Sequence, residues 1–137
     1  MDLQLQGKRA LVSGSSKGIG YAIAKLLAAE GAEVWINGRT QKAVASACAR
    51  IRDDMPQAKV HELAADLSTA DGVAAAVAAL PAVDILVNNL GIYERKPFDD
   101  IADADWQRFF DVNVMSGVRP ARAYLPGMKT RDWGRIV

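Results

Sequence analysis

A glycine-rich segment at residues 13–20 places the tightest constraint on the fold of this chain. It follows an apolar run at residues 10–12 and precedes apolar residues at helical spacing, which predicts a strand, a tight turn and a helix start. The first N–H groups of a helix lack internal partners and carry partial positive charge, so such a start attracts phosphate. Gly14, Gly18 and Gly20 let the backbone turn and approach a ligand, because no Cβ intervenes. The segment therefore favours a dinucleotide-binding site over a plain turn.

The rest of the chain alternates between short apolar runs and longer amphipathic runs. Strands are expected over residues 8–13, 33–37, 58–64 and 83–87, with another starting at 134–137. Helices are expected over residues 18–30, 41–53, 69–80 and from residue 103 onward. We expect Pro120 and Pro126 to kink or shorten that last helix. Strands separated by helix-length segments predict an α/β fold, a three-layer doubly wound parallel sheet with helices on both faces.

Composition and charge narrow the classes of function. A formal net charge of +1 gives no indication of nucleic acid or of an anionic membrane as a partner. The N-terminus lacks the basic and apolar regions of a signal peptide, and no apolar run approaches the roughly 20 residues of a membrane span. These features favour a cytoplasmic protein. Cys48 is expected to be a small core residue, and His61 has no neighbouring ligand, so no metal site is predicted.

The C-terminal residues 134–137 have the pattern of a strand that has just begun, and the sequence ends on the apolar Val137. An unfinished strand exposes apolar surface and an unpaired edge. We therefore expect residues 1–137 to be the N-terminal portion of a longer protein, a portion that contains the predicted dinucleotide-binding site.

Two basic residues bear on the choice of cofactor, because ligands of doubly wound sheets lie beyond the carboxyl ends of the strands. Arg39 follows the second predicted strand, where an acidic residue would bind a ribose 2′-hydroxyl and an arginine suits a 2′-phosphate. Lys17 in the glycine-rich segment can reach the same phosphate. Their joint placement favours NADP(H), while NAD(H) stays possible; the alternative interpretation is two solvated surface charges.

Polar residues follow the third and fourth predicted strands as well. Asp66 either accepts a hydrogen bond from the adenine amino group, with Ser68 sharing the work, or caps the next helix. Asn88 and Asn89 are explained by turn chemistry alone, or they brace the backbone and line the nicotinamide ribose. The candidate cofactor-binding residues are Gly14, Ser16, Lys17, Gly18, Ile19, Gly20, Arg39, Thr40, Asp66, Leu67, Asn88, Asn89 and Gly91.

Asn113 lies within the last predicted helix among apolar neighbours, where asparagine is unfavourable and needs hydrogen-bond partners if it is buried. Two explanations are open at this point. The residue is either a satisfied structural amide or the site of a local kink that frees a carbonyl group for a water molecule.

Four motifs together resemble those of the short-chain dehydrogenase/reductase family: Ser13-Gly14-x-x-x-Gly18-Ile19-Gly20, Asp66-Leu67, Asn88-Asn89-Leu90-Gly91 and Val112-Asn113-Val114. The resemblance covers essentially the whole chain and is nearest to 3-oxoacyl-carrier-protein reductase-like members. It implies a Rossmann fold, a nicotinamide cofactor and hydride transfer between nicotinamide and a small-molecule carbonyl or alcohol. It also implies that Asn113 is catalytic, holding a water in the proton relay, and that the full-length protein is a homo-oligomer.

The sequence departs from the family pattern at Leu90, where alanine is usual, and at Pro120, in a helix that usually helps to form the subunit interface. The family's catalytic serine and Tyr-x-x-x-Lys pair lie after the fifth strand, so the resemblance implies that this chain alone is inactive. Tyr21 and Lys25 match the spacing of that pair, but they lie in the helix predicted to receive the pyrophosphate, and we interpret them as a surface pair. The rival hypothesis is a non-catalytic dinucleotide-binding module or partner subunit.

Overall fold

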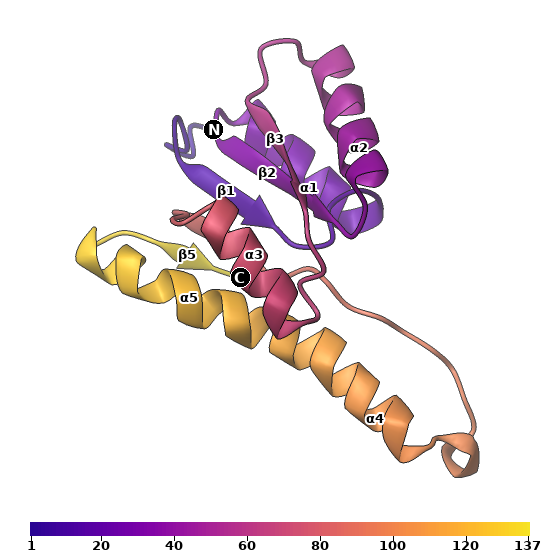
Figure 1. The fold of residues 1–137 in the computed structure, drawn as a ribbon. Helices are drawn as coiled ribbons and strands as arrows, with labels where there is room; N and C mark the ends of the chain where they lie inside the picture. The colour runs from indigo at the N-terminus through magenta and orange to yellow at the C-terminus, as the bar shows by residue number, and fades with distance from the viewer.

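Five parallel strands form the central sheet of the computed structural model, which describes residues 1–137. Their order across the sheet is β3-β2-β1-β4-β5 (Figure 1). The strands are β1 (Arg9–Val12), β2 (Glu33–Gly38), β3 (Val60–Ala64), β4 (Ile85–Val87) and β5 (Arg135–Ile136). The α-helices are α1 (Gly18–Ala29), α2 (Gln41–Asp54), α3 (Ala70–Ala79), α4 (Asp103–Phe110) and α5 (Ser116–Thr130). The predicted α/β order is confirmed.

The sheet lies between two helical layers. Successive residues of β1 point to opposite faces of the sheet, and each face packs against its own helices. Ala10 and Val12 belong to one apolar cluster with buried residues of α1 and α2, and Cys48 of α2 is fully buried there, as predicted. Leu11, between them in sequence, belongs to a second cluster with α3 and with Tyr124 of α5. The molecule is therefore the predicted three-layer, doubly wound sheet, that is, a Rossmann fold.

The order of the strands fixes where a ligand site is expected. The chain moves outward from β1 to β2 and β3, then returns to place β4 on the other side of β1. Crossover connections therefore leave β1 and β4 in opposite directions, which opens a crevice at the carboxyl ends of these two strands. The glycine-rich segment after β1 and the two asparagines after β4 both lie at this point.

An arm, residues 91–115, extends away from the sheet (Figure 1). It contains a long loop, a short 3-10 helix η1 (Phe98–Asp100), the helix α4 and a π-helical turn η2 (Asp111–Met115) that leads directly into α5. No residue of α4 is buried. The arm thus contributes nothing to the core, whereas α5 returns along the sheet and does.

Of the two expected effects of the prolines on the last helix, a kink or a shorter C-terminal part, the shortening was wrong. Pro120 and Pro126 both lie inside α5, which continues to Thr130. Each proline removes one backbone donor, but the side chains of Tyr124 and Met128 are buried against the second apolar cluster. Tertiary packing therefore maintains the helix beyond both prolines, as it often does against intrinsic propensity.

Candidate functional site

The loops that follow β1 and β4 are fastened to each other. The side-chain amide of Asn89 donates from Nδ2 to the carbonyl oxygens of Ser13 and Gly14, each at 3.0 Å. The hydroxyl of Ser13 accepts hydrogen bonds from the backbone N–H groups of Asn89 and Leu90, both at 2.9 Å. Asn89 therefore braces the glycine-rich segment, while its contact with a nicotinamide ribose stays a prediction.

A buried asparagine that the sequence reasoning missed, Asn37, connects the ends of three strands. Its Nδ2 donates to the carbonyl oxygens of Leu63 and Ala65 at 3.1 and 3.0 Å, and its Oδ1 accepts from the N–H of Gly14 at 3.0 Å. Its own N–H donates to the Ser15 hydroxyl at 2.8 Å. Both Asn37 and Ser15 are buried. The sequence does contain an indication of this role: Asn37 is a polar residue near the end of an otherwise apolar strand.

The glycines of the loop are required by conformation and by space. Gly14 and Gly18 adopt positive φ angles of 59° and 61°, a region that other residues enter only at a cost. Gly20 has no room for a side chain: a Cβ there would lie 2.4 Å from the carbonyl oxygen of Gly14 and 2.5 Å from Nδ2 of Asn89. Its backbone is thus packed directly against the brace.

The N-terminus of α1 has no competing group of its own. No side chain caps it, and its first turn contains no acidic residue. The unpartnered N–H groups and the helix dipole therefore remain available to an anion held over the glycine-rich segment.

The loops after β1 and β2 lie in contact. A Cβ added to Gly38 would lie 3.3 Å from both Cβ and Oγ of Ser16. The next residues in the two loops are Lys17 and Arg39, and both are exposed. Neither takes part in an ion pair in the structure. The two basic residues singled out from the sequence therefore emerge from neighbouring loops with their charges uncompensated.

Three other predicted site residues, Thr40, Leu67 and Ile19, differ in their contacts and in how far their side chains are exposed. The hydroxyl of Thr40 accepts from the N–H of Ala43 at 3.2 Å, so Thr40 caps α2. The side chain of Leu67 is 1% exposed and belongs to the second apolar cluster, which leaves only its backbone to face a ligand. By contrast, the side chain of Ile19 is 75% exposed at the start of α1.

Asp66 does not cap α3, so that alternative was wrong. The cap is Thr69, whose hydroxyl accepts from the N–H of Gly72 at 3.0 Å. Asp66 lies three residues earlier and closes a local turn: its Oδ1 accepts from the N–H of Ser68 at 3.0 Å and from the hydroxyl of Ser68 at 2.6 Å. Asp66 and Ser68 are thus paired at the exit of β3, where their contact with an adenine stays a prediction.

The two asparagines after β4 differ in their environments. Asn88 has a buried Oδ1 with no hydrogen-bond partner, the only such side-chain atom in the structure. A buried polar atom without a partner is costly, so it marks a place where a further group is expected. Leu90, which replaces the usual alanine, packs against the second apolar cluster and lies 3.3 Å from where a Cβ on Gly14 would be. The larger side chain of Leu90 therefore packs between the second apolar cluster and the glycine-rich segment.

Asn113 lies in the π-helical turn η2, which is the local irregularity that one reading of the sequence proposed. Its side chain is exposed and fastens the arm: Oδ1 accepts from the N–H of Ile92 at 2.8 Å. Gly91 precedes Ile92, and a Cβ on Gly91 would lie 2.9 Å from the same oxygen. The side-chain amide is therefore occupied in positioning the loop after β4, and a water-binding role for the backbone of η2 stays a prediction.

Tyr21 and Lys25 are both half-buried in the structure, and Tyr21 packs against the first apolar cluster. Lys25 forms a hydrogen bond and an ion pair with Asp54 of α2, and the hydrogen bond is the main cause that raises the pKa of Lys25 above its ordinary value. The hydroxyl of Tyr124, which is buried, donates to the carbonyl oxygen of Leu80 at 2.9 Å. Burial raises the pKa of Tyr124 to about 12, which makes it a poor proton donor and a structural residue.

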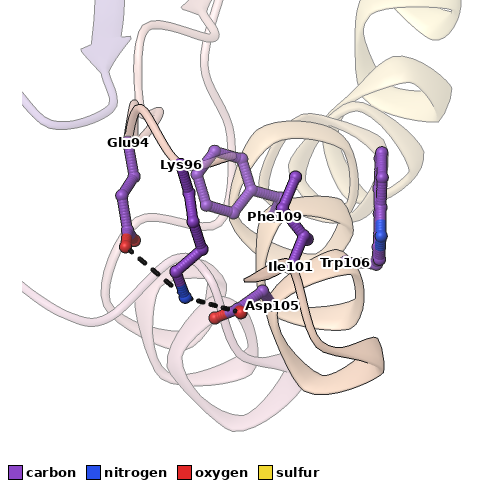
Figure 2. A pocket seen from close by; sticks show the side chains of 6 residues that line it. All are labelled: Glu94, Lys96, Ile101, Asp105, Trp106 and Phe109. Atoms are coloured by element: carbon purple, nitrogen blue, oxygen red, sulfur yellow. Dashed lines mark hydrogen bonds and ion pairs between the residues drawn. The ribbon is translucent and has the colours of Figure 1, made fainter. Parts of the chain in front are cut away.

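A pocket of about 210 Å³ lies on the arm, apart from the carboxyl ends of the strands (Figure 2). Ile101, Trp106 and Phe109 form its apolar wall. At its rim the ammonium group of Lys96 lies 2.9 Å from a carboxylate oxygen of Asp105 and 3.9 Å from one of Glu94. The pocket is therefore formed by the contacts that hold the loop of the arm onto α4.

The structure contains neither a membrane-spanning helix nor a cluster of metal-ligating side chains. None of its helices combines the length and the apolar character needed to cross a bilayer. It contains no group of three or more His, Cys, Asp or Glu side chains placed to hold a metal ion.

A doubly wound parallel sheet with an anion-attracting glycine loop at its switch point defines the class of dinucleotide-binding Rossmann proteins. Within that class, the family model described as short chain dehydrogenase matches residues 8–137. The chain belongs to the short-chain dehydrogenase/reductase family.

Relatives with known sequences or structures agree with this assignment. The chain is 49% identical to the uncharacterized oxidoreductase YvaG of Bacillus subtilis, over 100% of this chain and 52% of YvaG. It is 39% identical to the D-beta-hydroxybutyrate dehydrogenase of Cupriavidus necator, over 97% of this chain and 52% of that enzyme. The crystal structure of L-sorbose reductase from Gluconobacter frateurii, complexed with NADPH and L-sorbose, superposes with a TM-score of 0.92 and 37% identity, over 99% of this chain and 53% of that one. The chain thus spans about half the length of these relatives.

Proposed function

We propose that this chain is the cofactor-binding part of an NADP(H)-dependent oxidoreductase that acts on a small-molecule carbonyl or alcohol. The observation that carries the proposal is the emergence of two uncompensated cations, Lys17 and Arg39, from contacting loops beside the glycine-rich segment. A 2′-phosphate distinguishes NADP(H) from NAD(H), and arginine binds such a group with two parallel hydrogen bonds. The NADPH complex of L-sorbose reductase supports the same assignment.

The residues present fit a dinucleotide. The uncapped start of α1, beside the glycine-rich segment, suits the pyrophosphate. The paired side chains of Asp66 and Ser68 lie at the exit of β3, where we expect the adenine. Asn89 holds the backbone of the loop in place, and the unpartnered Oδ1 of Asn88 is ready to accept a hydrogen bond near the switch point.

The bound nicotinamide supplies or accepts the hydride, and the chain's own residues bind and orient it. The rigid brace between the loops after β1 and β4 reduces the conformational entropy lost on binding. We propose that the π-helical turn around Asn113 leaves a backbone carbonyl free to hold a water of the proton relay, because α-helical hydrogen bonding is interrupted there. The proton donor for the substrate is not among the tyrosines described above.

The test of the cofactor assignment is a pair of titrations with NADPH and NADH. For the Arg39→Asp variant, the preference for NADPH should fall by about 10-fold or more, because a charge-assisted hydrogen bond worth about 1.5–3 kcal/mol is replaced by repulsion. Lys59→Asp, at an exposed position before β3 and away from the carboxyl ends of the strands, is the matched control and should leave the preference unchanged. An unchanged preference in Arg39→Asp would refute the 2′-phosphate assignment.

The rival hypothesis, a non-catalytic dinucleotide-binding module or partner subunit, makes the same binding prediction. The two differ in turnover. We expect the 137-residue chain to bind NADPH without reducing carbonyl compounds. The ring of Tyr21 lies against the guanidinium of Arg50 and Lys25 pairs with Asp54 of α2, so these two residues do not act on a substrate. Mixing it with a polypeptide that corresponds to the second half of a relative should restore turnover if the enzyme hypothesis is correct. A module would remain inactive under the same conditions.

A further inference from the structure

Arg50, a residue of α2 that none of the motifs includes, contacts the glycine-rich segment from the side. Its Nη2 donates to the carbonyl oxygen of Ser16 at 2.8 Å. Its guanidinium also lies over the ring of Tyr21 in α1, with Cζ at 4.3 Å from the ring centroid. One side chain thus joins α2, the glycine-rich segment and α1, although residues 16 and 50 are 34 positions apart in sequence.

The carbonyl of Ser16 is an effective place for such a contact. Ser16 packs against Gly38, so it lies where the loops after β1 and β2 meet. Lys17 and Arg39, the next residues of the two loops, are the proposed ligands of the 2′-phosphate. A hydrogen bond that fixes Ser16 therefore also fixes the backbone from which Lys17 extends relative to Arg39.

We propose that Arg50 is a positioning residue for cofactor selectivity: it holds the Ser16–Lys17 backbone in the geometry that lets Lys17 and Arg39 grip a 2′-phosphate together. This inference rests on the proposed NADP(H) binding and extends it to a residue outside the two loops. Arg50 acts through Ser16, because its bonded Nη2 is engaged with a backbone carbonyl and its guanidinium plane is engaged with Tyr21. A planar guanidinium suits both contacts at once, whereas an ammonium group provides only a point charge.

Positioning and simple charge attraction make different predictions for Tyr21. Removing the ring in Tyr21→Leu leaves the charge of Arg50 in place but removes the surface against which its guanidinium lies. Tyr21→Phe keeps that surface and removes only the hydroxyl, so it is the matched control. If Arg50 acted only through its charge, neither change at Tyr21 would affect the cofactor.

The experiment is fluorescence titration of the purified protein and its variants with NADPH and with NADH, together with thermal unfolding of each variant. We expect Arg50→Met and Tyr21→Leu to lower the preference for NADPH by roughly 3- to 10-fold, the range that corresponds to one exposed hydrogen bond. Arg50→Lys should recover only part of the loss. Tyr21→Phe and Lys59→Met, which removes an equal charge at the other end of the sheet, should match the wild type.

Three results would overturn the inference. The first is an unchanged NADPH preference in Arg50→Met, and the second is a full effect in Arg50→Met with none in Tyr21→Leu, which would indicate charge alone. The third is an equal loss of affinity for both cofactors, which would indicate general support of the loop. These results differ from a failure of the proposed function, which would appear as a wild-type protein that binds neither cofactor.

Discussion

The sheet region and the arm hold their polar side chains in opposite ways. In the sheet region, Asn37 is 2% exposed, and four of its hydrogen bonds join the loop after β1 to the end of β3. On the arm, four charged side chains, Glu94, Lys96, Asp105 and Arg108, pair at the surface. Apolar side chains are exposed there as well, and Trp106 is 57% exposed. Buried hydrogen bonds are expensive to break, whereas exposed ion pairs contribute little. The carboxyl end of the sheet is therefore built for fixed geometry, and the arm for a local stability that is much lower.

The largest expected effect comes from comparing one residue type in the two regions. Asn37→Ala should lower the free energy of unfolding by about 3 kcal/mol, because it leaves three buried or half-buried groups, the N–H of Gly14 and the carbonyls of Leu63 and Ala65, without their partner. Asn113→Ala removes a single hydrogen bond from an exposed side chain and should cost about 1 kcal/mol or less. Urea unfolding of both variants measures the difference. Equal losses would contradict the contrast between the regions.

The second comparison lies within the glycine-rich segment. Gly20→Ala should lower the free energy of unfolding by about 2 kcal/mol, since its Cβ would press on the carbonyl oxygen of Gly14 and on the amide of Asn89. Gly18→Ala meets no atom within 4 Å and should cost only the strain of a positive φ, about 1 kcal/mol. Chemical unfolding gives both values. The proposed site adds a second difference, because Gly20→Ala should also weaken NADPH binding by displacing Asn89.

These two comparisons show what the sequence could reveal. Apolar periodicity was sufficient for the order of strands and helices, and the glycine spacing for the loop, because both signals are local. Asn37 was missed because its partners come from other strands, and nothing near it in sequence indicates them. The prolines of α5 misled for the same reason: local chemistry predicted a kinked or shorter helix, but the burial of Tyr124 and Met128 keeps the helix at its full length.

The site itself was predicted unevenly. Two features agree with the prediction from the sequence: Gly14 adopts a positive φ angle, and Arg39 is exposed. Both could be predicted because they depend on local turn chemistry at the end of a strand. Asp66 was considered as the cap of α3, but the cap is Thr69, an equally good capping residue that lies three positions later. Cofactor contacts at these residues stay predictions, and the titrations described above test them.

The third prediction concerns Tyr124, where α5 rejoins the core. Tyr124→Phe removes the hydrogen bond to Leu80 and should cost about 1 kcal/mol in the free energy of unfolding. Burial raises the pKa of Tyr124 from 10.0 to about 12 in the folded protein. The stabilisation that its protonated hydroxyl gives to the folded state is therefore complete below pH 10 and is lost as the pH rises towards 12. The difference in phenolate absorbance between wild type and Tyr124→Phe reports this titration. A midpoint near pH 10 in folded protein would contradict the burial argument.

The smallest effect is expected on the arm, at Asp105. A hydrogen bond from Lys96, then one from the N–H of Ala102, holds the pKa of Asp105 below its ordinary value of 3.8. Because the pKa of Asp105 is lowered in the folded state, its contact with Lys96 stabilises the arm at pH values above the ordinary pKa. This stabilisation is lost as the pH falls through the pKa of the folded state. Carboxyl carbon shifts in NMR spectra give the pKa directly, and amide exchange over residues 94–102 reports the loosening. We expect little change in global stability, since the carboxylate is exposed and α4 carries no buried residue.

The control for that prediction is Lys96→Met, which should move the pKa of Asp105 back towards 3.8 while leaving the hydrogen bond from Ala102 in place. An unchanged pKa would mean that the backbone of α4 alone sets the titration of Asp105. If exchange over the arm then accelerated without any change in the Asn37 network, the two regions would be shown to open separately. If both responded together, the arm would belong to the same cooperative unit as the sheet, and the contrast drawn from burial would fail.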